Sequence, residues 1–193
     1  MTSARIFQNR RIWRLTHDAF LAAAALVAER EAGSPPAAVI GIARGGVPFA
    51  ESVAAQLGVP AYAFRARHNR SEEIQQAATG HVDLEVELSA ATALAQLPQG
   101  SPLLVVDDIC GSGATLRAVV AALAASLETT CVRTAVLCRN AGADYPLDSW
   151  GWDVADWVHF PWEPAPDTDG SQDFELLPPL SRLQTAPLPA PRA

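Results

Sequence analysis

The sequence predicts an α/β fold with a mainly parallel central sheet flanked by helices. Three observations predict it. Apolar segments of strand length alternate along the chain with segments of helical composition, as in folds built from βαβ units. The segment Leu103–Val106 is apolar without interruption, which is typical of a parallel strand covered on both faces. Two such segments, ending near Ala43 and Val106, lead into glycine-containing turns of the kind that precede helices in these folds.

The first half of the chain is expected to begin with a helix. Thr16 can cap this helix, Asp18 suits its positive end, and the helix should run to about Glu31 before Gly33 and two prolines end it. A strand, a second helix and a second strand are then predicted at residues 37–43, 47–57 and 59–66.

The second half should complete the sheet. A short edge strand is expected at residues 84–88, and the apolar strand at 102–107 leads into a helix at 114–127. Two further strands are predicted at residues 131–138 and 157–160.

The 193 residues are enough for one domain with a sizeable core, and we expect this domain to span residues 1–163. Residues 164–193 are rich in proline, alanine and acidic residues, so this tail is predicted to be largely disordered. Leu176, Leu177 and Leu180 are the residues that would hold it on the body.

Charge and composition exclude several classes of protein. The net charge of −7 argues against general nucleic-acid binding, and all 14 basic residues are arginine. The arginines near the start of the chain are predicted to form a solvated or interface arm: Arg5, Arg10, Arg11 and Arg14. No segment is long and apolar enough to span a membrane and no secretory pattern is present, so a cytoplasmic location is expected.

The most informative segment is Leu103-Leu-Val-Val-Asp-Asp-Ile-Cys-Gly-Ser-Gly-Ala-Thr-Leu116. The small residues 111–115 allow backbone N–H groups to surround an anion at the start of a helix. Asp107 and Asp108 end the strand, where open α/β sheets bind ligands. Carboxylates repel phosphate but accept from hydroxyl groups, so the segment predicts a site for a phosphorylated sugar.

This segment resembles the phosphoribosyl-pyrophosphate (PRPP) motif of type I phosphoribosyltransferases. The resemblance implies that Asp107 and Asp108 hold the two ribose hydroxyls. It also implies that the 5′-phosphate is bound by the following loop: Gly111, Ser112, Gly113, Ala114 and Thr115. The alternative is an ordinary strand-to-helix turn, which rarely combines two adjacent acids with a loop of this kind.

A second element, Val39-Ile-Gly-Ile-Ala-Arg-Gly-Gly46, is similar to the pyrophosphate loop of the same family. Paired glycines let the backbone approach a ligand closely, and an arginine fork can bind two phosphate oxygens. The resemblance implies that Arg44, Gly45 and Gly46 bind pyrophosphate and that Arg44 acts in catalysis with the acid pair. By itself this tripeptide would indicate only a turn.

A third element, Asp156-Trp-Val-His-Phe-Pro-Trp-Glu163, is similar to the last strand of the xanthine/hypoxanthine/guanine branch. The resemblance implies that Trp157 and Val158 form a wall of the base pocket. The alternative is that both tryptophans belong to the core, which we favour for Trp162. His159 is a candidate for proton transfer or a structural histidine, and Arg139 either contacts the base or is a surface arginine.

The family resemblance implies displacement of pyrophosphate from C1 of PRPP by a ring nitrogen of a nucleobase, most simply a purine-like 6-oxo base in purine salvage. It implies Mg²⁺ near Asp107 and Asp108, reached through the ribose hydroxyls or water. It further implies a flexible hood at about residues 67–88 that closes over the substrates, and a homo-oligomer, either dimer or tetramer.

The sequence departs from this branch at Gly111, where relatives usually carry an aspartate that accepts the N7 proton of the purine. Either another group, such as His159 or Asp144, takes this proton, or the acceptor needs no such help. Two alternatives therefore remain: a phosphoribosyltransferase of specialised metabolism that uses an unusual heterocycle or amine, and a non-catalytic regulator that senses PRPP or a nucleotide.

Overall fold

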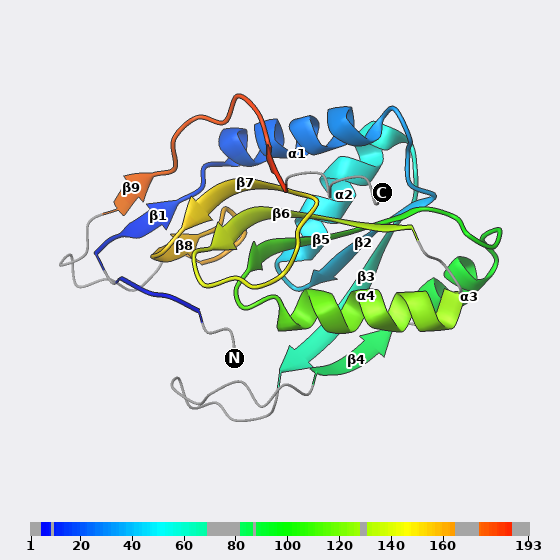
Figure 1. The fold of residues 1–193 in the computed structure, drawn as a ribbon. Coiled ribbons are helices and arrows are strands. Elements are labelled where there is room, and N and C mark those ends of the chain that lie inside the picture. Colours follow the sequence, from blue (N-terminus) through cyan, green and yellow to red (C-terminus); the bar gives the residue numbers. More distant parts are fainter. Residues whose placement is uncertain are drawn as a thin grey trace, which may run out of the picture.

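The computed structural model describes residues 5–8, 10–68, 82–86, 88–127, 131–164 and 174–186. Its centre is a seven-stranded sheet in the order β10-β7-β6-β5-β2-β3-β4, with helices on both faces (Figure 1). The five inner strands are parallel: β2 (Ala38–Ala43), β3 (Ala61–His68), β5 (Leu103–Cys110), β6 (Val132–Asn140) and β7 (Ser149–Val154). The predicted α/β fold with a mainly parallel sheet is therefore confirmed.

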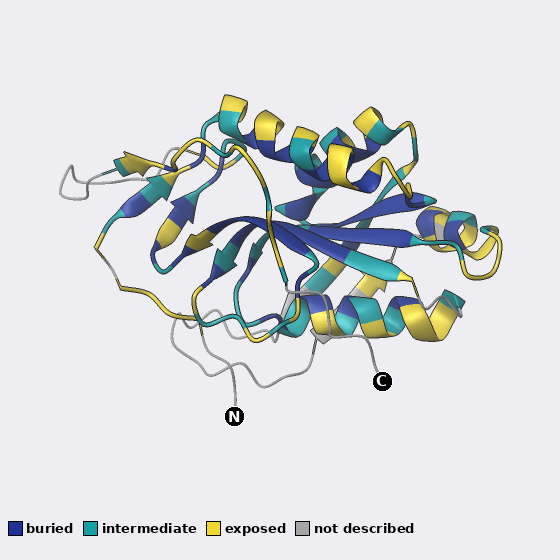
Figure 2. Ribbon diagram, turned by 45° about the horizontal axis from the view of Figure 1, so that its top comes forward, coloured by how far each residue is buried: buried dark blue, intermediate teal, exposed yellow. Residues whose placement is uncertain are grey.

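Helices cover the two faces of this sheet, which explains why the first four residues of β5 are all apolar. Successive residues of a strand point to opposite faces of the sheet. Leu104 and Val106 pack with the helices α1 (His17–Glu31) and α2 (Gly46–Leu57), whereas Leu103 and Val105 pack with α4 (Ala114–Leu127). In Figure 2 the inner strands are dark blue, and the helices show yellow on their outer sides.

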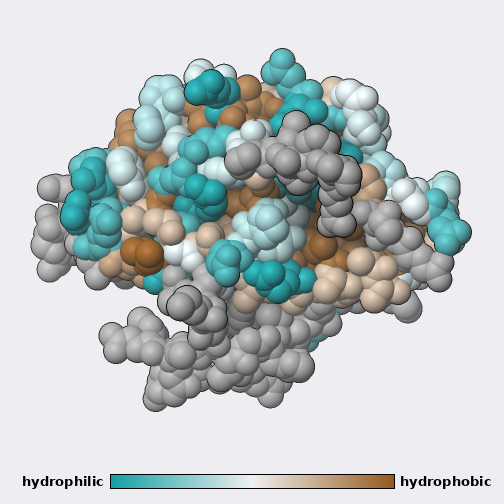
Figure 3. Space-filling view, in the orientation of Figure 1, coloured by the Kyte–Doolittle hydropathy of each residue, from teal (hydrophilic) through white to brown (hydrophobic). Residues whose placement is uncertain are grey.

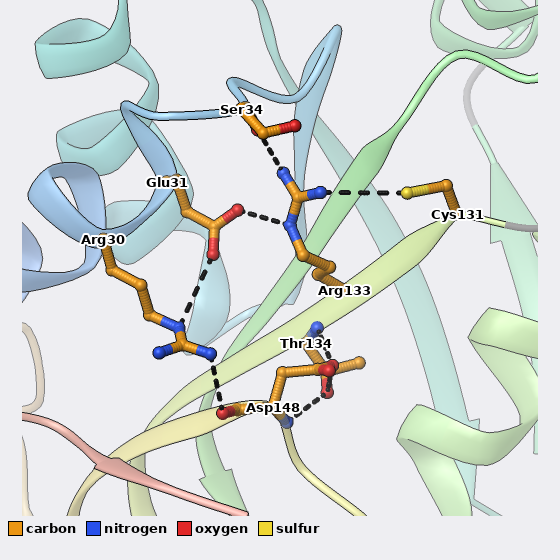
Figure 4. Close-up of polar contacts among 7 residues, drawn as sticks. All are labelled: Arg30, Glu31, Ser34, Cys131, Arg133, Thr134 and Asp148. Carbon is orange, nitrogen blue, oxygen red and sulfur yellow. Dashed lines mark hydrogen bonds and ion pairs between the residues drawn. The ribbon is translucent and has the colours of Figure 1, made fainter. Parts of the chain in front are cut away.

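The start of α1 follows the prediction. The Oγ1 atom of Thr16 accepts a hydrogen bond from the backbone N–H of Ala19 at 3.1 Å, so Thr16 is the N-cap. At the other end, buried Glu31 accepts from Arg133 Nε at 2.5 Å and lies 3.9 Å from Arg30 Nε (Figure 4). Arg133 also donates to the Ser34 carbonyl, which ties α1 to the start of β6.

Two elements that the sequence analysis missed flank the core. In β7, Trp152 packs in one hydrophobic core and Trp150 in the other. Gly151 and Asp153 interrupt the apolar residues of this strand, so the segment has no continuous apolar run. The helix α3 (Leu88–Ala95) follows β4 (Val82–Val86). The edge strand expected at 84–88 is β4, antiparallel to β3; residues 69–81 of the expected hood lie outside the described residues.

A second, three-stranded sheet lies beside the first and joins distant parts of the chain. Its strands are parallel: β8 (Trp157–His159), β1 (Ile12–Arg14) and β9 (Phe174–Leu176). The strand expected at 157–160 thus exists, but it pairs with β1, a three-residue strand too short to give a periodic signal.

The structure corrects the expectation of a disordered tail for residues 174–186. Phe174–Leu176 form β9, and β10 (Gln184–Thr185) pairs antiparallel with β7 at the edge of the main sheet. Leu177 is buried and Leu180 packs against the same core. The composition of the whole segment predicted disorder, but Leu177 and Leu180 find apolar partners in the core. Residues 165–173 and 187–193 lie outside the described residues.

The surface shown in Figure 3 mixes small groups of hydrophobic and hydrophilic residues. Among the described residues, no helix has both the length and the apolar character needed to cross a membrane.

Replacing Leu177 with alanine tests the assignment of the tail to the core. Leu177 is 6% exposed, so Leu177→Ala should lower the free energy of unfolding by about 2–4 kcal/mol in chemical denaturation. The adjacent Leu176 is 63% exposed, so Leu176→Ala should change it by less than about 0.5 kcal/mol. Equal effects would contradict the packing of the tail.

Candidate functional site

Two sequence motifs more than sixty residues apart meet at the carboxyl edge of the main sheet. The parallel register pairs Gly41 of β2 with Val106 of β5. The turn after β2, which contains Arg44, therefore lies level with the acid pair near the end of β5. This edge is where ligands bind in open α/β sheets.

The two glycines of that turn are required by close contacts with β5. A Cβ atom on Gly45 would overlap the carboxylate of Asp108. One on Gly46 would lie 2.6 Å from the carbonyl oxygen of Val106 and 2.9 Å from the Cα atom of Asp107. Any side chain at either position would push the turn away from the acid pair. Arg44 itself follows a cis peptide bond and is exposed.

Asp107 and Asp108 lie within β5, which continues to Cys110, three residues beyond the predicted end. The N–H of Asp108 donates to Oδ1 of Asp107 at 2.9 Å. Burial, and then the charge of Asp108, raise the pKa of Asp107 well above its usual value. Burial also raises the pKa of Asp108 to about 6, and nearby Glu163 contributes to this increase. Negative charge is therefore costly here, and hydroxyl donors or a cation would offset the cost.

The loop after β5 leads directly into α4, which begins at Ala114 as predicted. Ser112 Oγ accepts from the N–H of Ala114 at 3.3 Å, and Gly113 has a φ of 86°. A Cβ on Gly113 would also collide with Tyr145, so both conformation and space require glycine there. The positive end of the α4 dipole faces the same edge as the acid pair, which suits an anion.

Arg5 also lies at this edge, although the sequence analysis placed it in a surface arm. A Cβ atom on Gly111 would collide with the Nε atom of Arg5, so the Arg5 side chain lies directly against Gly111. The charge of Arg5 makes a small contribution that lowers the pKa values of both aspartates. The cluster of arginines near the start of a chain without lysine was the available sign that Arg5 could bind an anion. The hydrogen bonds that hold the arm on Asn140 of β6 cannot be read from a sequence.

The residues expected at the base pocket divide into two groups. Trp157 is 56% exposed and its ring lies 5.3 Å from that of Phe7, so it is accessible to a ligand. Val158 is buried in the core, so its side chain is not accessible and only its backbone could contact a base. Trp162 stacks on Phe160 and belongs to the core edge, as we favoured.

Arg139 and His159 both have protein partners. Arg139 pairs with Cys110 in the strand register, which places it at the site edge, but its Nε donates to Asp153 and its guanidinium lies 3.9 Å from the centre of the Trp150 ring. The Nε2 atom of His159 lies 3.0 Å from the Pro164 carbonyl oxygen. These contacts favour a structural role for His159. Asp144 contacts the phosphate loop through its backbone N–H, 3.4 Å from the Ser112 carbonyl.

The acid pair provides some, but not all, of the oxygen ligands that a hard divalent cation needs. Asp107 and Asp108 offer carboxylate oxygens, whereas the described residues contain no group of three or more histidine, cysteine or acidic side chains that could hold a metal by themselves. Mg²⁺ is commonly bound by one or two carboxylates, with water and substrate oxygens completing its shell. The site therefore suits a metal that arrives with an anionic substrate.

A cavity of about 330 Å³ lies elsewhere. It is lined by Leu94, Ser101, Leu103 and neighbouring residues, at the opposite end of β5 from the acid pair, and none of its lining residues is titratable. The cavity has no groups for acid–base or electrostatic catalysis.

The comparisons with known proteins agree with this geometry. Residues 16–169 match the family model described as phosphoribosyl transferase domain. No curated protein matches the chain.

Similar solved structures share the fold at low sequence identity. A purine phosphoribosyltransferase from Pyrococcus horikoshii has a TM-score of 0.67 and 21% identity, over 82% of this chain and 98% of that one. The xanthine-guanine-hypoxanthine phosphoribosyltransferase of Helicobacter pylori has a TM-score of 0.63 and 19% identity, over 80% and 93%. A hypothetical protein from Neisseria gonorrhoeae with bound ppGpp has a TM-score of 0.63 and 23% identity, over 80% and 90%.

The raised pKa of Asp108 predicts how stability depends on pH. Its ordinary value is 3.8 and its folded value is about 6, so the folded state binds more protons and the aspartate destabilises the ligand-free protein as pH rises from 4 to 6. Asp108→Asn should therefore raise the free energy of unfolding by roughly 1–3 kcal/mol at pH 7 and by much less at pH 4. Denaturation at both pH values, with Glu51→Gln at an exposed position in the middle of α2 as control, measures the difference. An equal effect at both pH values would contradict the assigned pKa.

Proposed function

The chain belongs to the phosphoribosyl transferase domain family and is a PRPP-dependent phosphoribosyltransferase, and we propose that it transfers the 5-phosphoribosyl group to a ring nitrogen of a purine-like 6-oxo base. Pyrophosphate is the second product. The observation that carries this proposal is the contact of the Gly45–Gly46 turn with Asp107 and Asp108. It brings a candidate pyrophosphate loop against a candidate ribose site, as a single PRPP molecule requires.

In this proposal the two carboxylates bind the ribose. Asp107 and Asp108 accept hydrogen bonds from the 2′- and 3′-hydroxyls, which offsets the cost of burying them. The 5′-phosphate is bound by residues 111–115, where Ser112 and Gly113 shape the loop and the α4 dipole attracts the anion. These contacts hold C1 in a fixed place relative to the leaving group and the acceptor.

The leaving group is bound on the other side of C1. The backbone of Gly45 and Gly46 lies close enough to contact pyrophosphate, and exposed Arg44 binds its oxygens with the guanidinium fork. Asp107 and Asp108 would hold Mg²⁺ through water or the ribose hydroxyls, and the ion would supply positive charge to offset that of the pyrophosphate. The acid pair faces the sugar, so neither aspartate acts as a general base.

The acceptor pocket is proposed along β8 and the end of β6. The exposed face of Trp157 stacks on the heterocycle, and the backbone of Val158 lines the pocket beside it. Arg139 contacts the 6-oxo group when it exchanges Asp153 for the substrate. His159 is the weakest member of this set because its ring contacts Pro164. By family resemblance, the enzyme acts in cytoplasmic purine salvage as a dimer or tetramer.

Gly111 keeps two other functions open. A transferase of specialised metabolism with an unusual heterocycle or amine would use the same PRPP site without a carboxylate at this position. A regulator that senses PRPP or a nucleotide is the other, and the ppGpp bound to the similar Neisseria protein favours it as a second candidate.

The ribose site is tested by PRPP binding. Calorimetry with Mg²⁺ should give a measurable affinity, and Asp107→Ala or Asp108→Ala should weaken it by about fivefold or more, because the ribose hydroxyls lose their acceptors. Glu29→Ala removes an exposed carboxylate from the last turns of α1, which leads to the start of β2 at the opposite edge of the sheet, and should leave the affinity unchanged. Unaltered affinity in both site variants would remove the proposed sugar site.

The acceptor is tested by pyrophosphate release with PRPP, Mg²⁺ and one base at a time: hypoxanthine, guanine, xanthine, adenine, orotate or uracil. We expect release with a 6-oxo purine and little with adenine, since Arg139 donates to an oxo group that adenine lacks. Tight PRPP binding without release for any base would contradict the proposed acceptor and favour the two alternatives.

A further inference from the structure

The N-terminal arm, residues 5–8 with Arg10, is attached to the body by specific hydrogen bonds. The N–H of Ile6 donates to Asn140 Oδ1 at 2.8 Å, and Asn140 Nδ2 donates back to the Ile6 carbonyl at 2.9 Å. The N–H groups of Gln8 and Arg10 donate to the Ala155 carbonyl and to Asp156 Oδ1. Asn140 is buried at the end of β6, so the arm follows the edge of the sheet.

This attachment brings the positively charged side chain of Arg5 to the edge of the sheet that carries the acid pair. The Arg5 side chain lies against Gly111, and its charge acts on both Asp107 and Asp108. Within the described residues, the guanidinium forms no ion pair or hydrogen bond; its one assigned contact is the Phe7 ring, 5.9 Å away. A guanidinium with unused donors beside the acid pair is available to an anionic ligand.

An aromatic surface continues from this cation. Phe7 and Trp157 are 36% and 56% exposed, and their rings are tilted by 33° with centroids 5.3 Å apart. Arginine next to exposed aromatic faces suits a flat heterocycle that carries negative charge. The row Arg5–Phe7–Trp157 thus runs from the phosphate loop to the proposed base wall.

We propose that Arg5 is a substrate-binding residue that holds the acceptor as its anion, so that the enzyme selects acidic planar heterocycles. This inference rests on the proposed function, which needs an acceptor beside C1 of PRPP. Asp107 and Asp108 repel an anion at this edge, and Arg5 offsets that repulsion. Arg5 takes the space in front of Gly111 that any side chain, including an acidic one, would otherwise fill.

An anionic acceptor also removes the need for a general base at Gly111. The ring N–H loses its proton to solvent before binding. The ring nitrogen then forms the bond to C1 with its electron pair, while the bond from C1 to pyrophosphate breaks and its electrons leave on the pyrophosphate oxygen. No protein group receives a proton in this step.

Steady-state kinetics with xanthine and hypoxanthine tests the inference, because xanthine is the more acidic of two otherwise similar 6-oxo purines. Arg5→Met, which keeps length and removes charge, should raise KM for xanthine about tenfold or more, as expected for loss of a charge-assisted contact. The KM for hypoxanthine and the kcat values should change by less than about threefold. Arg5→Lys should recover part of the xanthine affinity, which a merely structural role would not predict.

A further variant controls for the arm. Arg10→Ala removes the same charge from the same arm and retains the backbone bond to Asp156, so it should leave KM for xanthine unchanged. Circular dichroism and PRPP calorimetry on each arginine variant measure whether the fold and the sugar site persist.

The outcomes separate this inference from the proposed function. If wild-type protein binds no PRPP, the proposed function fails. If PRPP binds but xanthine neither binds nor reacts, or if Arg5→Met affects xanthine and hypoxanthine equally, the role of Arg5 is wrong and the transferase assignment stands.

Discussion

The site depends on one close contact, between the turn after β2 and the end of β5. Backbone at Gly45 and Gly46 lies against Asp108 and Val106 at distances that exclude a side chain. The parallel pairing of β2 with β5 creates this contact, and the two apolar cores hold the pairing on both faces of the sheet. The rest of the proposed chemistry follows from it, because this contact brings the proposed leaving-group loop next to the proposed ribose site.

The second constraint is electrostatic. Burial raises the pKa values of the two adjacent aspartates, and the charge of Asp108 raises that of Asp107 further, so negative charge at this edge is costly. PRPP is itself highly anionic, and the chain contains no lysine. Arg5 and Arg44 reach the edge of the site from different segments, one before β1 and one after β2, and together they provide the fixed positive charge that such substrates require.

The ends of the chain help to build the site. The small sheet β8-β1-β9 joins residues 12–14, 157–159 and 174–176, and Leu177 completes the core beneath it. The N-terminal arm continues from β1 toward Gly111, while β8 positions Trp157 beside Phe7. The proposed acceptor side of the site thus combines β8, which the sequence analysis placed there, with an N-terminal arm that it described as solvated or part of an interface.

The sequence by itself determined five strands of the main sheet, from β2 to β6, the helices α1, α2 and α4, the cap at Thr16 and the start of α4. It also led to the proposal that residues 44–46 and 107–115 act together. These features are local: a continuous apolar strand, a capping side chain or a small-residue turn is encoded by neighbouring residues. Only the tertiary structure decided that Arg5 lies at Gly111, that Val158 is buried and Trp157 exposed, and that residues 174–186 join the sheets. Those outcomes depend on contacts between segments that are distant in the sequence, several of them more than 100 residues apart, as for Ile6 with Asn140 and Ile12 with Trp157. The strands that make some of these contacts have two or three residues, so their stability comes from their partners and leaves no pattern in the sequence.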